Sequence, residues 1–215
     1  MSKLKALASL ISNPKALTAL LSFHSKGYLN TIGWFKSFES KQSVDMNGNP
    51  IPWVTYSFID FIEERIAKTH AIFEYGSGNS THYYASKAGT VVSVEHDEAW
   101  FNSVKGSNPK NAEIIFCALQ TNGDYSRMAA QTGKKYDVII VDGRDRVNCC
   151  KHSVDALADG GVLVLDDSER TDYNEGRIFL KTKGYKELKF SGISPGLFYY
   201  KSTSVFYKAN NCLDI

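Results

Sequence analysis

The sequence has little net charge, few cysteines and no long apolar run. Its 25 basic and 23 acidic side chains are mixed along the chain and leave a formal charge of +2, so no nucleic-acid partner is expected. The four cysteines lack metal-ligand spacing, and the adjacent Cys149 and Cys150 cannot easily form a bridge, which favours a reducing, cytoplasmic compartment. No stretch reaches the roughly 20 apolar residues of a membrane span.

The length of 215 residues suits one domain with a full core. Apolar runs alternate with helix-length amphipathic segments, and continuous runs such as 138–141 are typical of strands that are covered on both faces. This pattern predicts an α/β fold, a Rossmann-like doubly wound sheet that is mostly parallel and has helices on both faces. The predicted parallel strands cover residues 71–75, 91–95, 113–117, 136–141 and 161–165.

The two ends of the chain depart from this alternation. Segments 185–190 and 202–207 alternate apolar and polar residues around a glycine-containing turn, which predicts an antiparallel C-terminal hairpin. Residues 1 to about 24 predict two short amphipathic helices; a signal peptide is the alternative, but Asn13 and Pro14 interrupt the apolar run too early for one. We expect a helical N-terminal extension with a loop, 1–50, before the main domain, 51–215.

Two further segments near this boundary carry local predictions. Residues 27–50 contain glycines and polar residues that predict loop and turn. Residues 57–68 place apolar side chains at helical spacing and predict an amphipathic helix packed on the sheet. Trp53 and Tyr56 precede this helix, so we expect them to lie near a ligand crevice.

A glycine loop follows the first predicted strand. Glu74 precedes Gly76 and Gly78, which frame one serine before residues suited to begin a helix. Such a strand, loop and helix start binds nucleotide-like ligands, because glycine allows unusual backbone angles and close ligand approach. Glu95 lies nineteen residues after Gly76, where a carboxylate can accept hydrogen bonds from a ribose diol. Thr81 stands where a dinucleotide site has its third glycine, so the pattern favours a cationic adenosine ligand without phosphate.

Carboxylates end four of the predicted strands. Glu74 and Glu95 end the first two, Asp142 ends the fourth, and Asp166 and Asp167 end the fifth. In parallel sheets the ligand crevice lies beyond these carboxyl ends. Each carboxylate alone could cap the next helix. Four such ends together indicate a functional edge of the sheet.

These motifs carry a resemblance to a known family. The pattern Glu74-x-Gly76-x-Gly78, with Glu95 ending the next strand, resembles the binding signature of class I S-adenosylmethionine-dependent methyltransferases over residues 58–207. Segments 52–56, 73–81, 94–97 and 141–144 are similar to a largely uncharacterised group of bacterial methyltransferase-like proteins. The resemblance implies a seven-stranded sheet, S-adenosyl-L-methionine as cofactor, and no particular substrate.

The resemblance also implies roles for residues. Glu95 would hold the ribose hydroxyls, His96 would neighbour the adenine, and segment 120–124 would contact the adenine as well. Asp142 and Gly143 would face the methyl group and the substrate. The full set of expected cofactor-binding residues is Glu74, Gly76, Ser77, Gly78, Asn79, Ser80, Thr81, Glu95, His96, Asp142 and Gly143.

Catalysis of methyl transfer requires alignment of the nucleophile and, for a hydroxyl, removal of a proton. Asp142 is the first candidate for the base, with Arg144 and Asp167 as further catalytic candidates. His96 and His152 are weaker ones, and a helix-surface histidine such as His152 is more often structural.

Metal binding is a further hypothesis. Catechol-type O-methyltransferases, which the chain partly resembles, bind magnesium through an aspartate after the fourth strand and an Asp-Asn pair after the fifth. Here Asp142, Asp166 and Asp167 could hold such a divalent ion. Alternatively, Arg144 and Arg146 neutralise these acids or recognise an acidic substrate.

The sequence thus predicts an S-adenosylmethionine-dependent methyltransferase that methylates a hydroxyl of a small-molecule or glycan-type acceptor. A non-catalytic binding or sensor domain of the same fold is the first alternative. An NAD-dependent oxidoreductase is the second, disfavoured by Thr81. A homo-oligomer is compatible with the sequence.

Overall fold

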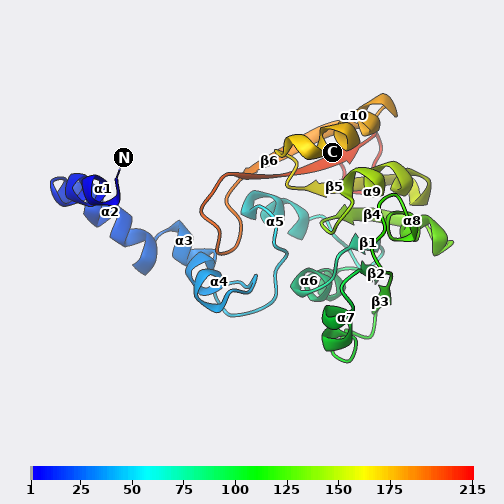
Figure 1. Cartoon of the computed structure of the whole chain (residues 1–215), viewed down its shortest axis with the longest axis horizontal. Helices are drawn as coiled ribbons and strands as arrows, with labels where there is room; N and C mark the ends of the chain where they lie inside the picture. Colours follow the sequence, from blue (N-terminus) through cyan, green and yellow to red (C-terminus); the bar gives the residue numbers. More distant parts are fainter. Residues whose placement is uncertain (1) are drawn as a thin grey trace.

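A seven-stranded sheet forms the centre of the computed structural model, which describes residues 2–215 (Figure 1). The strand order is β3-β2-β1-β4-β5-β7-β6. All neighbours pair in parallel except β7, which runs antiparallel to both β5 and β6. The strands are β1 (Ala71–Tyr75), β2 (Thr90–Glu95), β3 (Ala112–Phe116), β4 (Tyr136–Val141), β5 (Leu157–Asp166), β6 (Lys186–Gly192) and β7 (Lys201–Tyr207).

Helices connect the parallel strands and cover both faces of the sheet. The described helices, of which α1 to α5 precede β1, are α1 (Lys3–Ile11), α2 (Pro14–Ser25), α3 (Tyr28–Thr31), α4 (Trp34–Ser40), α5 (Tyr56–Glu63), α6 (Asn79–Lys87), α7 (Glu98–Val104), α8 (Asp124–Gln131), α9 (Arg146–Ser153) and α10 (Asn174–Thr182), with 3₁₀ turns η1 (Val154–Ala156) and η2 (Thr171–Tyr173). The predicted doubly wound fold with its reversed C-terminal hairpin is confirmed.

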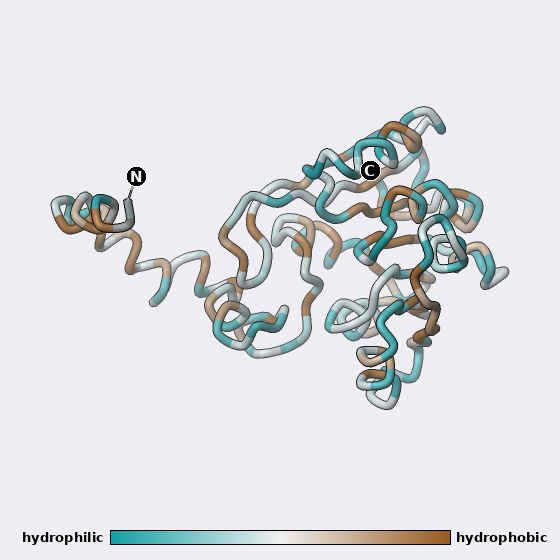
Figure 2. Tube along the Cα trace, in the orientation of Figure 1, coloured by the Kyte–Doolittle hydropathy of each residue, from teal (hydrophilic) through white to brown (hydrophobic). Residues whose placement is uncertain are grey.

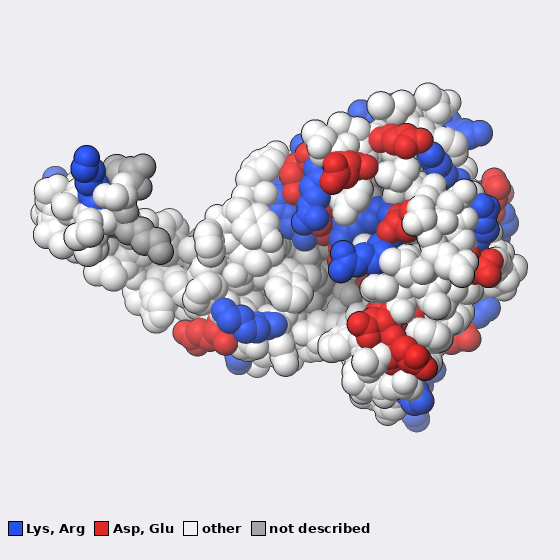
Figure 3. All heavy atoms as spheres, in the orientation of Figure 1, with Lys and Arg blue, Asp and Glu red and all other residues white. Residues whose placement is uncertain are grey.

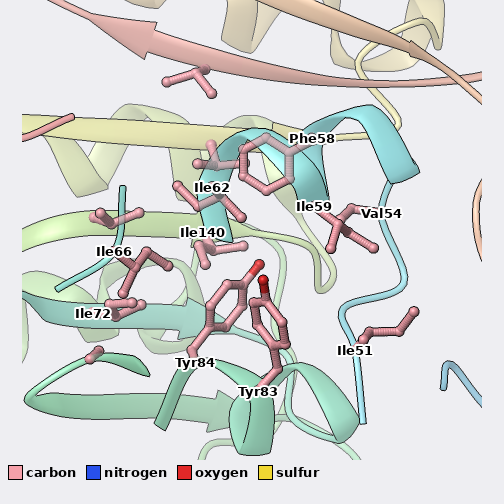
Figure 4. Close-up of a cluster of buried hydrophobic side chains, with 14 of the residues drawn as sticks. Ile51, Val54, Phe58, Ile59, Ile62, Ile66, Ile72, Tyr83, Tyr84 and Ile140 are labelled. Atoms are coloured by element: carbon pink, nitrogen blue, oxygen red, sulfur yellow. The ribbon is translucent and has the colours of Figure 1, made fainter. Parts of the chain in front are cut away.

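Two apolar cores sandwich the sheet because successive strand side chains point to opposite faces. Ile72 and Ile140 join the core beneath α5 and α6, where Phe58 and Tyr84 are fully buried (Figure 4). The next residue along β1, Phe73, points to the other core, which α8, α9 and α10 cover. Burial on both faces explains the continuous apolar runs of the central strands.

The N-terminal region differs from its prediction. The two helices expected before residue 24 are present as α1 and α2, but segment 27–50, expected to be loop and turn, contains α3 and α4. Trp34 of α4 is 8% exposed and joins the main core, and its indole Nε1 donates to the carbonyl of Leu197 at 2.8 Å. Local glycines predicted a loop because this long-range packing cannot be read from neighbouring residues. The proposed boundary at residue 50 stays a prediction.

The helix predicted for 57–68 is α5 and ends five residues early, at Glu63. Within residues 2–215, none of the helices combines the length and apolar character needed to cross a bilayer.

Candidate functional site

A cavity of about 580 Å³ opens beyond the carboxyl ends of β1, β2, β4 and β5. Its size is ordinary for a small-molecule or cofactor site. Figure 3 shows acidic and basic side chains gathered around the hollow of this face. The wall combines the glycine loop, the strand-end carboxylates, two rim arginines and a piece of the N-terminal region: Lys41, Gln42, Ser43, Ile51, Trp53, Glu74, Tyr75, Gly76, Ser77, Gly78, Asn79, Ser80, Glu95, His96, Trp100, Asp142, Gly143, Arg144, Arg146, Asp167, Arg170 and Tyr173.

The glycine loop needs its glycines for backbone geometry. Gly76 has φ = 100° and Gly78 has φ = 155°, values that other residues rarely adopt. The loop is braced from α7, since Trp100 donates its indole N–H to the carbonyl of Ser77 at 3.0 Å. The loop therefore presents its main chain to the cavity in a fixed conformation.

Glu95 is a preorganised hydrogen-bond acceptor in the cavity wall. It is 4% exposed, and its Oε1 accepts from the backbone N–H groups of His96 and Asp97 at 2.7 and 2.9 Å. The other oxygen, Oε2, accepts from the Ser77 hydroxyl at 2.9 Å. A carboxylate held in this way between the glycine loop and β2 can accept hydrogen bonds from a ribose diol.

Glu74 is a buried acid at the floor of the cavity. Burial raises its pKa to about 7, although hydrogen bonds from Ser80, Thr81 and Ser93 favour the ionised form. The Thr81 hydroxyl donates to Glu74 Oε2 at 2.7 Å, and the Ser93 hydroxyl donates at 3.0 Å. At neutral pH the group is therefore divided between its neutral and charged forms.

Thr81 has a different position from the one predicted. It is 1% exposed and lies beneath the loop, where its hydroxyl accepts from the Gly78 backbone N–H at 3.1 Å while donating to Glu74. All other predicted cofactor-binding residues line the cavity. A third glycine would lack this hydroxyl, so the threonine that argued against a dinucleotide site also holds Glu74 in place.

Three carboxylates and three basic side chains form a compact group after β4 and β5. Arg146 Nη2 lies 3.0 Å from Asp142 Oδ1, Lys201 Nζ lies 2.6 Å from Asp166 Oδ2, and Arg170 Nη2 lies 2.8 Å from Asp167 Oδ2. Lys201, from β7, is 6% exposed, and Asp166 is fully buried. Each acid thus has its own protein cation.

Asp142 is the member of this group most suited to proton transfer. Burial, together with the adjacent negative charge of Asp166, raises the pKa of Asp142 well above its usual range. The Asp142 side chain is 22% exposed and lines the cavity, whereas Asp166 is inaccessible. A raised pKa makes a carboxylate a stronger base when it is ionised, and at the cavity wall Asp142 lies where a bound hydroxyl could contact it.

The structure does not support the magnesium site predicted at Asp142, Asp166 and Asp167. Within residues 2–215, no group of three or more His, Cys, Asp or Glu side chains is arranged to hold a metal ion. Lys201 also lies 3.1 Å from Asp167 Oδ1, and Arg146 lies 3.3 Å from Asp167 Oδ2. These cations stand where a divalent ion would have to approach, so the predicted neutralisation of the acids is the better fit, with Lys201 added to Arg146.

Arg144 lies apart from these ion pairs. Its side chain is exposed at the cavity rim, and no ion pair of its guanidinium is found within residues 2–215. Its neighbour Gly143 packs directly against Tyr125, whose hydroxyl would overlap an added Cβ. The loop after β4 therefore has a fixed backbone and a free cationic side chain.

Several predicted site residues lie elsewhere. His152 Nε2 contacts Asn122 Oδ1 at 2.7 Å on the outside of α9, and neither residue lines the cavity. The rest of segment 120–124 does not line this cavity either, so the predicted adenine contact there stays a prediction. Of the two aromatic residues expected near the crevice, Trp53 lines the cavity, while Tyr56, the first residue of α5, is buried outside it.

Sequence reasoning missed two contributions to the site. Segment 41–43 forms part of the wall, and Asn79 Nδ2 donates to the carbonyl of Ser43 at 2.8 Å. Lys201 was missed because one lysine at the start of a predicted strand carries no signal of its partners. The burial of Lys201 and of the next five residues of β7 appears only in the structure, because Ser202, Thr203 and Ser204 give no apolar signal.

No protein-family model matches the chain, and no curated protein matches its sequence. Solved structures do match its fold. The chain is similar to an rRNA methylase from Streptococcus thermophilus, with a TM-score of 0.53 at 15% identity over 73% of this chain and 99% of that one. A methyltransferase-like protein from Silicibacter pomeroyi is similar with a TM-score of 0.55 at 22% identity, over 74% of this chain and 89% of that one. An N-methyltransferase from Bradyrhizobium japonicum, solved with S-adenosyl-L-homocysteine, is similar with a TM-score of 0.50 at 16% identity, over 70% of this chain and 85% of that one.

The fold is that of class I S-adenosylmethionine-dependent methyltransferases, as the glycine loop and the strand-end carboxylates predicted. One of the three similar proteins is named for rRNA, one for N-methylation and one for no acceptor, and each is less than 25% identical to the chain. These likenesses therefore show the fold of the chain and identify neither its ligand nor an acceptor.

Proposed function

We propose that the protein is an S-adenosyl-L-methionine-dependent methyltransferase that acts on a hydroxyl of a small-molecule or glycan-type acceptor. The observation that carries this proposal is the set of loop and acids in one cavity: Glu95 fixed by Ser77 for a ribose, and Glu74 buried beside the two glycines for a cationic group. When bound, the cofactor would supply a methyl group on a positively charged sulfur.

The residues of the chain would position the acceptor and take up its proton. Asp142, at the cavity wall, would accept the hydroxyl proton as the oxygen attacks the methyl carbon and the carbon–sulfur bond breaks. Asp167 would orient the acceptor beside it. Lys201 and Arg146 would hold the acidic group in place, so no metal is required for charge balance.

The position of Arg144 favours an acceptor that carries a negatively charged group. A rim arginine without an acidic partner in residues 2–215 can bind a carboxylate or phosphate through two parallel hydrogen bonds. Lys41 lines the same cavity and adds positive charge, whereas Arg170 is paired with Asp167. An acidic small molecule or sugar therefore fits this mouth better than a neutral one.

The deciding experiment is calorimetric titration of the protein with S-adenosylmethionine and S-adenosylhomocysteine, with and without magnesium. Binding of both ligands is expected, with affinities that magnesium does not change, because protein cations already pair with the strand-end acids. Absence of binding under both conditions would overturn the proposed function.

Glu95→Ala is expected to weaken S-adenosylmethionine binding by about 10- to 100-fold, the range for losing hydrogen bonds to a charged acceptor. The residue is the acceptor that the Ser77 hydroxyl fixes beside the loop. Calorimetry measures the effect, and Glu98→Ala, an exposed glutamate three residues later, is the matched control. Unchanged affinity in Glu95→Ala would remove the ribose assignment.

Cofactor affinity is expected to rise by up to about tenfold between about pH 6 and pH 8, because Glu74, with a pKa of about 7, becomes negative over this range and attracts the cationic ligand. In the ligand-free protein, the contribution of Glu74 to the free energy of unfolding should instead fall as the pH rises. The pKa in the folded state exceeds the ordinary value of 4.5, so this group's contribution to stability is complete below about pH 4.5 and is lost as pH rises through about 7.

Glu74→Gln is the test variant for this pH dependence. Glutamine keeps an acceptor for the Thr81 and Ser93 hydroxyls but cannot ionise. Titrations at several pH values should give a flat profile for this variant. If the variant retains the pH dependence of the original protein, another group is responsible.

A further inference from the structure

The N-terminal helices α1 and α2 form an arm that projects from the domain (Figure 1). Leu10 and Leu17 are partly buried, while large apolar side chains on both helices face solvent. Figure 2 shows brown, apolar stretches along the arm. The exposed side chains are Leu4 (81%), Leu7 (55%), Ile11 (64%), Leu20 (49%), Leu21 (63%) and Phe23 (38%). Exposed apolar residues gathered in this way mark a contact surface.

The charge of the arm is of one sign. Neither aspartate nor glutamate occurs in the sequence before Glu39, whereas Lys5 and Lys15 lie on the arm and Lys26 follows α2 directly. Figure 3 accordingly shows no acidic atoms on the visible face of the arm. Two copies of the arm would repel one another, because like charges would face each other across the contact. A partner that offers both an apolar layer and negative charge is complementary instead.

An aromatic loop lies at the base of the arm. Phe198, Tyr199 and Tyr200, between β6 and β7, are 77%, 51% and 61% exposed. The loop is fastened to α4 by the hydrogen bond from Trp34 to Leu197, and Gly196 packs against the α4 backbone. Amphipathic aromatic side chains such as tyrosine are favoured at the boundary between lipid and water.

We propose that the arm and the aromatic loop dock the protein on an anionic lipid surface. The apolar side chains would enter the boundary between headgroups and acyl chains, and the lysines would remain at the level of the negative headgroups. The surface is a lipid bilayer rather than a second copy of the chain, since only the former neutralises the lysines. This inference is independent of the proposed methyl transfer.

The two helices of the arm are too short to span a bilayer. Their 9 and 12 residues correspond to about 14 and 18 Å at 1.5 Å per residue, against roughly 30 Å for the hydrocarbon core. They would therefore lie in the plane of the surface. The Lys41–Ser43 piece of the cavity wall follows directly after α4, so docking would bring the candidate site close to the lipid.

The test is sedimentation of the full chain with vesicles of neutral phosphatidylcholine, with or without about 30 mol% phosphatidylglycerol. Binding to the anionic vesicles is expected to be at least about tenfold tighter than to neutral ones, and about 0.5 M salt should weaken it. The double variant Leu20→Asp, Leu21→Asp should bind at least about tenfold more weakly; both side chains are exposed, and far-UV circular dichroism verifies that the helices remain.

Charge variants distinguish lipid binding through the arm from a general attraction of lysines anywhere on the protein surface to anionic lipid. The double variant Lys5→Glu, Lys15→Glu should bind anionic vesicles at least about tenfold more weakly. Each lysine near an anionic surface contributes about fivefold to the affinity. Lys110→Glu with Lys183→Glu makes the same charge change at exposed positions outside the arm and should stay within about twofold. The proposal is overturned by no sedimentation with anionic vesicles, by equal losses in both charge variants, or by light scattering that shows an arm-dependent dimer in place of lipid binding.

Discussion

Asp142→Asn is expected to lower the turnover number by about 100- to 10,000-fold, the range for removing a general base. Asparagine has nearly the shape of aspartate and keeps an oxygen for Arg146, which lies 3.0 Å away, but it cannot accept the acceptor's proton. Cofactor affinity should change by less than about threefold, because the ribose and cationic contacts belong to Glu95 and Glu74.

The measurement pairs initial rates of S-adenosylhomocysteine release, with an acceptor found by screening acidic small molecules and sugars, with calorimetric cofactor binding. Asp159→Asn, at the opposite end of β5, is the matched control and should retain full turnover. If Asp142→Asn keeps full turnover, Asp142 is not the base. If the original protein binds cofactor but transfers no methyl to any acceptor, the non-catalytic binding domain becomes the better explanation.

Lys201→Met should lower the free energy of unfolding by about 3 to 5 kcal/mol, the usual loss when one partner of a buried ion pair is removed. Methionine has a similar volume and no charge, so Asp166 would stay fully buried with Arg146 Nη1, at 3.6 Å, as its nearest cation. The variant also loses the hydrogen bond from Lys201 to the carbonyl of Trp53. Urea unfolding followed by circular dichroism measures the change.

Lys151→Met is the comparison for this loss. Lys151 pairs with Glu175 at 2.6 Å, but the glutamate is 72% exposed, so its removal should cost less than about 1 kcal/mol. The double variant Lys201→Met, Asp166→Asn should recover part of the stability, because the uncompensated charge is removed as well. If Lys201→Met lowers the free energy of unfolding no more than Lys151→Met does, the buried ion pair of Lys201 with Asp166 does not stabilise the fold as proposed.

The sequence predicted the sheet well because its signals are local. Runs of apolar residues specify strands covered on both faces, and the Gly76 and Gly78 pair specifies a tight loop after β1. The strand-end acids were predicted for the same reason, since a parallel sheet brings strand ends to one edge. Ten of the eleven predicted cofactor residues line one cavity.

The parts that could not be predicted depend on contacts between distant segments. Lys201 reaches acids 34 and 35 positions earlier in the chain, so its partners follow from the hairpin register and not from its neighbours. The turn expected around residue 34 became a helix because Trp34 is buried against a loop 163 positions away. The metal hypothesis failed likewise, because three acids in a motif do not disclose which cations fold against them.

Arg146 has a mechanical consequence beyond charge balance. Its guanidinium donates to the carbonyls of Gly143 at 3.0 Å, Asp166 at 2.7 Å and Asp142 at 3.1 Å, and so cross-links the ends of β4 and β5. The two ends must move as one rigid body, which fixes the spacing between Asp142 and Asp167 while ligands enter and leave. Adaptation to acceptors of different shape is therefore left to exposed side chains at the rim, such as Arg144.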